Sequence, residues 1–302
     1  MKFREIVKKT NIDFIGMRNK SFVFSGVLVL LGFIAIGMLF MGKANLSVDF
    51  TGGTNLRLRF QEQVSIGDLR NVLTESGLND VQIQEVSGTK EFLVKTKLVD
   101  SEKEKVTDKI QNVLSTHLKG KKYEVLETNM VGPMVGETLK NNAIVAIIIS
   151  FIGIIIYIWI RFNLVFGITA VIATFHDVIC MLGIFVLLGR EMNMLFVTAM
   201  LTIAGFSLTD TVVIFDRIRE NMAKMKNKDE FGATINRSIN EVLSRSIVTS
   251  ISTFLVVVVL VFAGGVVLFD FALALLIGVL IGSYSSIFVA SPIIYLLRKK
   301  IP

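Results

Sequence analysis

The stretch that decides the fold is residues 142–160, which read NAIVAIIISFIGIIIYIWI and contain no charged side chain. The hydrocarbon core of a bilayer is about 30 Å thick, and a helix needs about 20 apolar residues to cross it. Lipid offers backbone N–H and C=O groups no partner, so such a run must be a helix. The sequence contains six long apolar runs, and therefore predicts six transmembrane helices, at 21–42, 142–160, 164–188, 194–215, 246–269 and 271–297.

The first of these runs is expected to remain in the protein. It is longer than the apolar core of a cleaved signal peptide, and Lys43-Ala44-Asn45 after it does not resemble a cleavage site made of small residues. We therefore interpret 21–42 as a retained transmembrane helix.

Composition and charge place the chain in a membrane and predict its orientation. The 302 residues have a mean hydropathy of +0.65 and a net charge of +7. Lys and Arg gather in the segments that share one side if the helices alternate, namely 1–20, 161–163, 216–245 and 298–302. Basic segments stay in the cytoplasm, so both termini are predicted to be cytoplasmic. The positive charges are distributed by the side of the membrane and do not form a nucleic-acid-binding motif. We therefore expect contact with lipid and no binding of nucleic acid.

The residue counts argue against an enzyme. One Cys and two His leave no disulfide framework and no metal cluster. The Gly37 to Lys43 stretch imitates a phosphate loop, but Ala44 stands where Ser or Thr is needed. Both His residues precede Ser207, so no His in a later span serves as its base for serine-protease chemistry. We expect no metal and no cofactor other than a coupling ion, with H⁺ expected and Na⁺ as the alternative.

Residues 43–140 are polar enough to form a folded domain between the first two spans. Strand patterns cover 46–60, 81–86, 92–99 and 123–130. A capping box at Ser65 opens one amphipathic helix, and 101–118 forms a second. The order β-α-β-β-α-β is that of a ferredoxin-like α+β domain. The predicted fold is thus a six-helix membrane bundle with one inserted extracytoplasmic domain.

Asp210 is the first candidate for function, because it lies well inside the fourth span. An ionised carboxylate there costs about 2.5 kcal/mol or more, so such residues usually face the bundle interior and serve a proton or ion path. A structural hydrogen bond to a neighbouring helix is the alternative.

Arg245, where the fifth span begins, is the second candidate. Glu241, Arg245, Thr249 and Ser252 recur at helical spacing, and a polar stripe of this kind calls for an interior face. Arg keeps its proton, so its role would be to hold a nearby carboxylate ionised. The alternative is a cation that reaches the membrane surface.

Asp177, mid-way along the third span, is a candidate for a second titrating group. The preceding His176 points about a hundred degrees away on a helix, so we do not expect the two side chains to face one groove together. A packed, neutral His176 is the alternative to a functional one.

Two groups of small residues are candidates for structural roles. Gly278, Gly282 and Ser286 repeat every four residues in the sixth span, and small residues on one helix face allow two helices to approach closely. Gly52 and Gly53 permit positive-φ backbone, which indicates either a structural bulge or a hinge between domain and membrane.

Four short motifs occur in a specific order along the chain. They are Val48-Asp49-Phe50-Thr51-Gly52-Gly53, Gly132-Pro133-Met134-Val135-Gly136, the span from Gly205 to Arg217, and the stretch from Asn236 through Arg245-Ser246 to Thr249-Ser250. Together with the six-span layout they resemble the SecF family, the smaller membrane subunits of the bacterial SecD–SecF protein-export complex in the RND superfamily. The resemblance covers nearly the whole chain.

The resemblance implies a function that composition does not. It implies a subunit of a bacterial cytoplasmic membrane that works with SecD. The pair uses the proton-motive force to help pull an unfolded exported polypeptide outward after SecA and the SecYEG channel have moved it. The family's membrane carboxylate maps to Asp210 and its basic residue to Arg245, followed here by Ser246 where the family usually has Thr. The alternatives are a small-molecule exporter of the RND type and a scaffold that only stabilises its partners.

Overall fold

The computed structural model describes residues 10–75, 78, 81–85, 90–97, 103–117, 121–225 and 230–297. Much of the predicted cytoplasmic N-terminus and the whole 298–302 tail lie outside these residues. The chain forms two compact units. The helical unit comprises Met1–Asn45, Ala146–Arg190 and Leu195–Pro302, and the sheet unit comprises Leu46–Val145 and Glu191–Met194.

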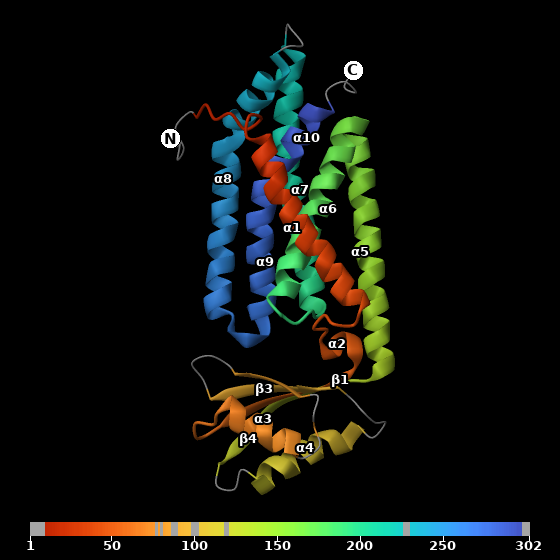
Figure 1. The fold of residues 1–302 in the computed structure, drawn as a ribbon, viewed down its shortest axis with the longest axis vertical. Helices are drawn as coiled ribbons and strands as arrows, with labels where there is room; N and C mark the ends of the chain where they lie inside the picture. The colour runs from red at the N-terminus through yellow and green to blue at the C-terminus, as the bar shows by residue number, and fades with distance from the viewer. Residues whose placement is uncertain are drawn as a thin grey trace. The chain divides into compact units, whose positions relative to one another are not determined.

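In the part of the chain that the structure describes, six helical segments are long and apolar enough to cross a membrane, as predicted. Figure 1 shows their course. They are α1 (Arg18–Phe40), α5 (Pro133–Arg161), α6 (Leu164–Leu187), α7 (Met194–Ala223), α8 (Phe231–Ala263) and a sixth made of α9 (Gly265–Ser285), the π-helical turn η2 (Ser286–Ala290) and α10 (Ser291–Leu296).

Several helices differ in extent from the hydropathy prediction. The fifth helix ends at Ala263 and not at residue 269, because Gly265 adopts a φ of 69° and turns the chain into α9. The predicted 216–245 loop is largely helical, since α7 continues to Ala223 and α8 begins at Phe231. Hydropathy marks only the apolar part of a helix, whereas polar residues extend these helices further.

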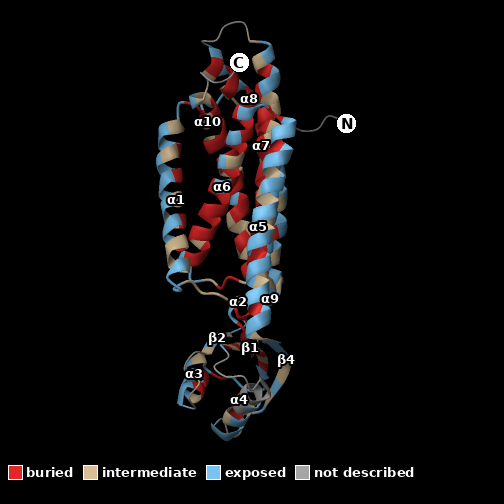
Figure 2. Ribbon diagram, turned by 90° about the vertical axis from the view of Figure 1, so that its right-hand side faces the viewer, coloured by how far each residue is buried: buried red, intermediate tan, exposed pale blue. Residues whose placement is uncertain are grey.

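The helical unit is built around α6. Figure 2 shows α6 buried along most of its length, whereas α5 is largely exposed. Aromatic rings fill the core, and Phe166 and Phe215 meet edge to face with 5.3 Å between their centroids. The exposed side chains of α1, α5 and α8 include many large apolar ones, as expected for surfaces that face lipid or a partner helix.

The sheet unit has four strands among its described residues: β1 (Gly53–Phe60), β2 (Val81–Glu85), β3 (Glu91–Thr96) and β4 (Tyr123–Val131). The strand order is β2-β3-β1-β4, and the neighbours are antiparallel. The two helices α3 (Ile66–Glu75) and α4 (Lys103–His117) pack on one face, around a core that includes Leu56, Leu58, Phe92, Leu69 and Ile110. The predicted β-α-β-β-α-β order is confirmed, and the sheet order is compatible with a ferredoxin-like domain.

The predicted strand over 46–60 is wrong in its first half. Residues Val48–Thr51 form a helical turn, α2, whose first turn is capped by Ser47 Oγ accepting from Asp49 N at 3.0 Å. Gly52, with a φ of 73°, ends the turn, and β1 begins only at Gly53. The parts of the other predictions at 86, 98–99, 101–102 and 118 lie outside the described residues.

Candidate functional site

Asp210 lies buried on α7 and is held on one side only. Its Oδ1 accepts a hydrogen bond of 2.7 Å from Ser246 Oγ on α8, and Ser246 is also buried. Its Oδ2 is buried and has no hydrogen-bond partner among the described residues. A buried polar atom without a partner costs free energy. A proton or a cation that binds this oxygen would therefore stabilise the site more than one that binds Oδ1.

Arg245 does not contact this carboxylate directly. Its side chain is exposed on α8, and within the described residues no hydrogen bond or ion pair joins it to Asp210. The next residue along the helix, Ser246, makes the contact instead. The sequence identified Ser246 only as a substitution for a family Thr, and its part in binding Asp210 was missed.

Asp177 on α6 is fully buried and fully partnered. Its Oδ2 accepts from Ser207 Oγ on α7 and from Ser285 Oγ on α9, the latter at 2.7 Å. Its Oδ1 lies 2.9 Å from His176 Nδ1. The expectation that His176 and Asp177 would not face one groove together is therefore wrong, because the imidazole is long enough to turn back onto the adjacent carboxylate.

A direct polar contact joins α7 to the sixth segment about one turn after Ser207 on α7. Thr211 Oγ1 and Ser286 Oγ lie 2.9 Å apart. Ser286 begins the π-helical turn η2, and Pro292, which has no N–H to donate, follows in α10. Single π turns are frequent at functional sites. The sequence did not predict this turn, for which the nearby Ser pair and Pro292 were the available signals.

The small residues of α9 lie directly against α7. A Cβ placed on Gly278 would come within 2.4 Å of Ile203 Cγ1, and one on Gly282 within 3.1 Å of Ser207 Cβ. The small residues thus lie where the two helices approach each other. This close approach brings Ser285 and Ser286 to the polar groups of α6 and α7.

Gly52 and Gly53 lie in a tightly packed junction inside the sheet unit. A Cβ on Gly53 would lie 2.4 Å from Thr96 O, and a Cβ on Gly136 would lie 2.8 Å from Gly52 N. Gly53 pairs with Val131 in regular register, and the shift in the β1–β4 register lies between Arg57 and Leu58, so the described residues show no bulge at Gly53. The two glycines are needed here for close approach and positive φ.

Comparison with known proteins places the chain in a family. Residues 110–300 match the family described as protein export membrane protein SecD/SecF, C-terminal, and residues 38–64 match the SecD/SecF GG motif. The protein translocase subunit SecF of Thermodesulfovibrio yellowstonii is 48% identical over 296 residues, covering 98% of this chain and 97% of that one. The chain belongs to the SecF family. The resemblance noted from its motifs is confirmed.

Solved structures support the same family. A crystal structure of SecDF from Thermus thermophilus, described as a translocon-associated membrane protein, superposes with a TM-score of 0.82 at 35% identity. A SecDF structure in a super-membrane-facing form gives 0.69 at 34% identity. This chain is covered to 96% and 97%, but it spans only 39% and 40% of those longer chains. The relatives are named as translocase subunits, which fits a role in transport and not in catalysis.

Proposed function

We propose that this SecF-family subunit works with SecD to use the proton-motive force in late steps of polypeptide export across the bacterial cytoplasmic membrane. The observation that carries the proposal is the buried Asp210 carboxylate, with Oδ1 bound by Ser246 and Oδ2 unpartnered. A proton arriving at Oδ2 removes the cost of a buried negative charge. It also turns an acceptor into a donor, which changes the hydrogen bonds that the site favours.

Protonation of Asp210 is expected to alter the α7–α8 contact. The ionised carboxylate attracts the hydroxyl of Ser246 and the positive charge of Arg245, the preceding residue of α8, and the neutral acid attracts both less. Two arrangements of α7 against α8 with different proton affinity provide the two states that a proton-driven cycle requires.

Asp177 is proposed as a second titrating group of this path. It contacts α7 through Ser207, one turn before Asp210, and the sixth segment through Ser285. A change of charge at Asp177 would therefore act on both helices. The coupling ion is proposed to be H⁺, with Na⁺ as the alternative.

The proposed partners and orientation are supported by the family and by the charge pattern. A Thermus thermophilus relative, 38% identical over 272 residues, is named SecDF, and this chain covers 36% of its length. We therefore propose SecD as the partner, with SecYEG, SecA and the unfolded exported polypeptide completing the assembly. We propose that both termini lie in the cytoplasm and the sheet unit outside it, because basic segments favour the cytoplasmic side. The names of the relatives, which are protein translocase subunits, support this function over a small-molecule exporter.

The proposal is tested by Asp210→Asn in membrane vesicles that contain the full translocase. The expected result is loss of the proton-dependent stimulation of precursor export, with SecD still co-purifying. Asp216→Asn is the matched control, because Asp216 lies on the same helix as Asp210, is partly exposed and pairs with Arg161 of α5 at 2.5 Å. Full stimulation in Asp210→Asn would refute the carrier role and favour a scaffold. Repeating the measurement with a sodium gradient in place of a proton gradient identifies the ion.

A further inference from the structure

The connection between α6 and α7 is part of the sheet unit. Residues Glu191–Met194 belong to it, although α6 and nearly all of α7 belong to the helical unit. Ser47 N donates to Met192 O at 2.9 Å, and Leu46 and Met192 form a parallel bridge. The connection is thus hydrogen-bonded to the segment that leads into α2.

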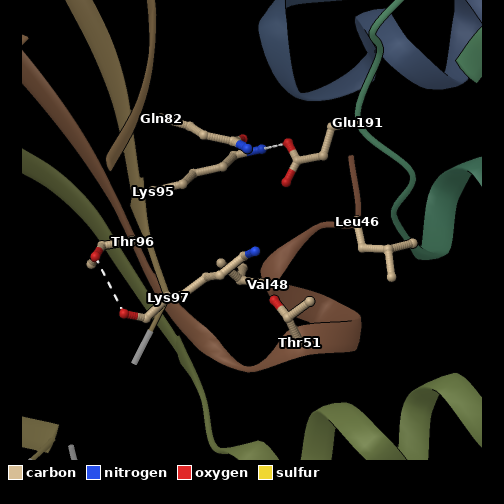
Figure 3. Close-up of a pocket in the computed structure, with 8 residues that line it drawn as sticks. All are labelled: Leu46, Val48, Thr51, Gln82, Lys95, Thr96, Lys97 and Glu191. Carbon is tan, nitrogen blue, oxygen red and sulfur yellow. Dashed lines mark hydrogen bonds and ion pairs between the residues drawn. The ribbon is translucent and has the colours of Figure 1, made fainter. Parts of the chain in front are cut away.

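A shielded ion pair fixes the same connection to the sheet. Lys95 of β3 pairs with Glu191, and their side chains are only 14% and 8% exposed. Figure 3 shows the two side chains pointing toward each other, with Gln82 of β2 beside Lys95. A small cavity of about 20 Å³ adjoins the pair. Removal of one partner from such a pair leaves an uncompensated charge, so the pair strongly favours one position of residue 191.

Asp49 holds the first residue of α7. Its Oδ2 accepts from Met194 N at 3.1 Å, and Met194 is where α7 begins. The first N–H groups of a helix lack partners within the helix, and a negative charge there is favourable. Asp49 is itself held in place, since α2 is followed by the closely packed Gly52 and Gly53.

We propose that Asp49, Lys95 and Glu191 are positioning residues of a rigid junction that makes the start of α7 move with the sheet unit. Asp210 lies 16 residues beyond Met194 on the same helix, about 24 Å at 1.5 Å per residue. A displacement of α7 that begins at Asp210 therefore reaches the sheet through a continuous helix and this junction. The inference rests on the proposed function, and it opposes a hinge at Gly52 and Gly53.

The close contacts around the two glycines support a junction that does not bend. An added methyl group at Gly53 would overlap Thr96 O of β3, and one at Gly136 would overlap the backbone of Gly52. Backbone packed this closely has little freedom to change φ and ψ. The Lys95–Glu191 ion pair and the Asp49 contact therefore hold the start of α7 against backbone that does not bend.

The functional test measures proton flux and precursor export separately, in vesicles that hold the intact chain with SecD, SecYEG and SecA. Lys95→Met and Glu191→Gln are each expected to lose most of the proton-dependent export while proton flux continues. The exchanged variant, Lys95→Glu with Glu191→Lys, is expected to recover roughly half of it or more, since the pair is restored. Arg59→Gln is the control, because it breaks a different ion pair, with Glu91, in the same sheet unit.

Amide exchange tests the junction without relying on transport. In Asp49→Ala the Met194 amide is expected to exchange about tenfold faster, because it loses one charge-assisted hydrogen bond. The exchange rates of amides in the middle of α7 should not change. Unchanged exchange at Met194, or full export in both single variants, overturns the junction. A wild-type complex without proton dependence overturns the proposed function instead, and the exchange result still decides the junction.

Discussion

Ser246 Oγ donates to Asp210 Oδ1 at 2.7 Å, and this bond joins α8 to α7 inside the helical unit. The donor is one residue beyond Arg245, which the sequence had singled out, and it is as buried as the carboxylate that it binds. At Asp210 the contact between the two helices is therefore made by a neutral hydroxyl. The carboxylate is left with one oxygen for a proton.

Ser246→Ala is expected to reduce the stability of the purified protein by about 1–3 kcal/mol, because it leaves a buried acceptor without its donor. It should also reduce proton-dependent export. Ser246→Thr keeps the hydroxyl and should retain most of both. Thermal unfolding and vesicle export are the measurements. Ser252→Ala is the control, since among the described residues that exposed hydroxyl donates only to Val248 O of its own helix. Equal behaviour of the two Ala variants would contradict the assignment.

Gly278→Val is expected to disturb the approach of α9 to α7. Its Cβ would lie 2.4 Å from Ile203 Cγ1, and overfilling of a packed contact typically costs about 1–3 kcal/mol. The measurement is the unfolding temperature in detergent together with co-purification of SecD. Gly205→Val is the matched control on α7, because an added Cβ at Gly205 meets nothing within 4 Å. A larger loss from the control would show that helix propensity and not packing decides the result.

The six spans and the order of strands and helices along the chain could be predicted because periodicity and apolar length are local properties of the sequence. Asp177, Asp210 and the small residues of α9 also stand out, since charge or lack of a side chain is unusual at those positions. The partners of these residues do not stand out. Ser246, Ser207 and Ser285 resemble any helix serine, and only the packing of four helices brings them to the carboxylates.

Local backbone details were the other limit of the sequence. The turn α2 was predicted as part of a strand over 46–60, whereas Ser47 caps a helical turn there. Gly264 and Gly265 end α8 six residues before the hydropathy pattern changes. In both places a cap or a positive φ decides the structure, and the apolar pattern on either side does not record it.

Glu91→Gln is expected to lower the stability of the sheet unit at neutral pH. The hydrogen bond from Arg59, and a second from Arg57, hold the pKa of Glu91 below its usual value. A depressed pKa means that the ionised carboxylate stabilises the folded state above the pKa of the unfolded chain. The contribution is lost as the pH falls from about 4.3 through the folded pKa.

The measurement for Glu91 is unfolding as a function of pH, followed by amide exchange in β1 and β3 of the intact protein. The difference between wild type and Glu91→Gln should be largest near neutral pH and should shrink below pH of about 4. Glu124→Gln on β4 is the control. Glu124 lies opposite Arg59 in the strand register, but among the described residues the two side chains form no ion pair. A difference that does not change with pH would mean that the carboxylate acts by shape alone.

Asn240→Ala is expected to loosen the segment that precedes α1. Asn240 Oδ1 accepts from Thr10 Oγ1 at 2.7 Å and from Ile12 N at 3.0 Å, and its Nδ2 donates to Ile12 O at 2.9 Å. The motif from Asn236 to Asn240 thus binds the chain's own N-terminal segment. Loss of these bonds should destabilise the protein by about 1–3 kcal/mol and speed exchange of the Ile12 amide.

The matched control for this segment is Asn129→Ala, because in the part of the chain that the structure describes its exposed side-chain amide bonds only to Glu127 on its own strand. It should leave the Ile12 amide unchanged. Ile15 supplies a second comparison, since its N–H is bound by Asn236 at 3.0 Å and not by Asn240. If the segment is held residue by residue, Asn240→Ala speeds exchange at Ile12 more than at Ile15. Equal acceleration of exchange at both positions would show that the segment is released as one unit. No acceleration at either position would show that Asn240 does not hold the segment.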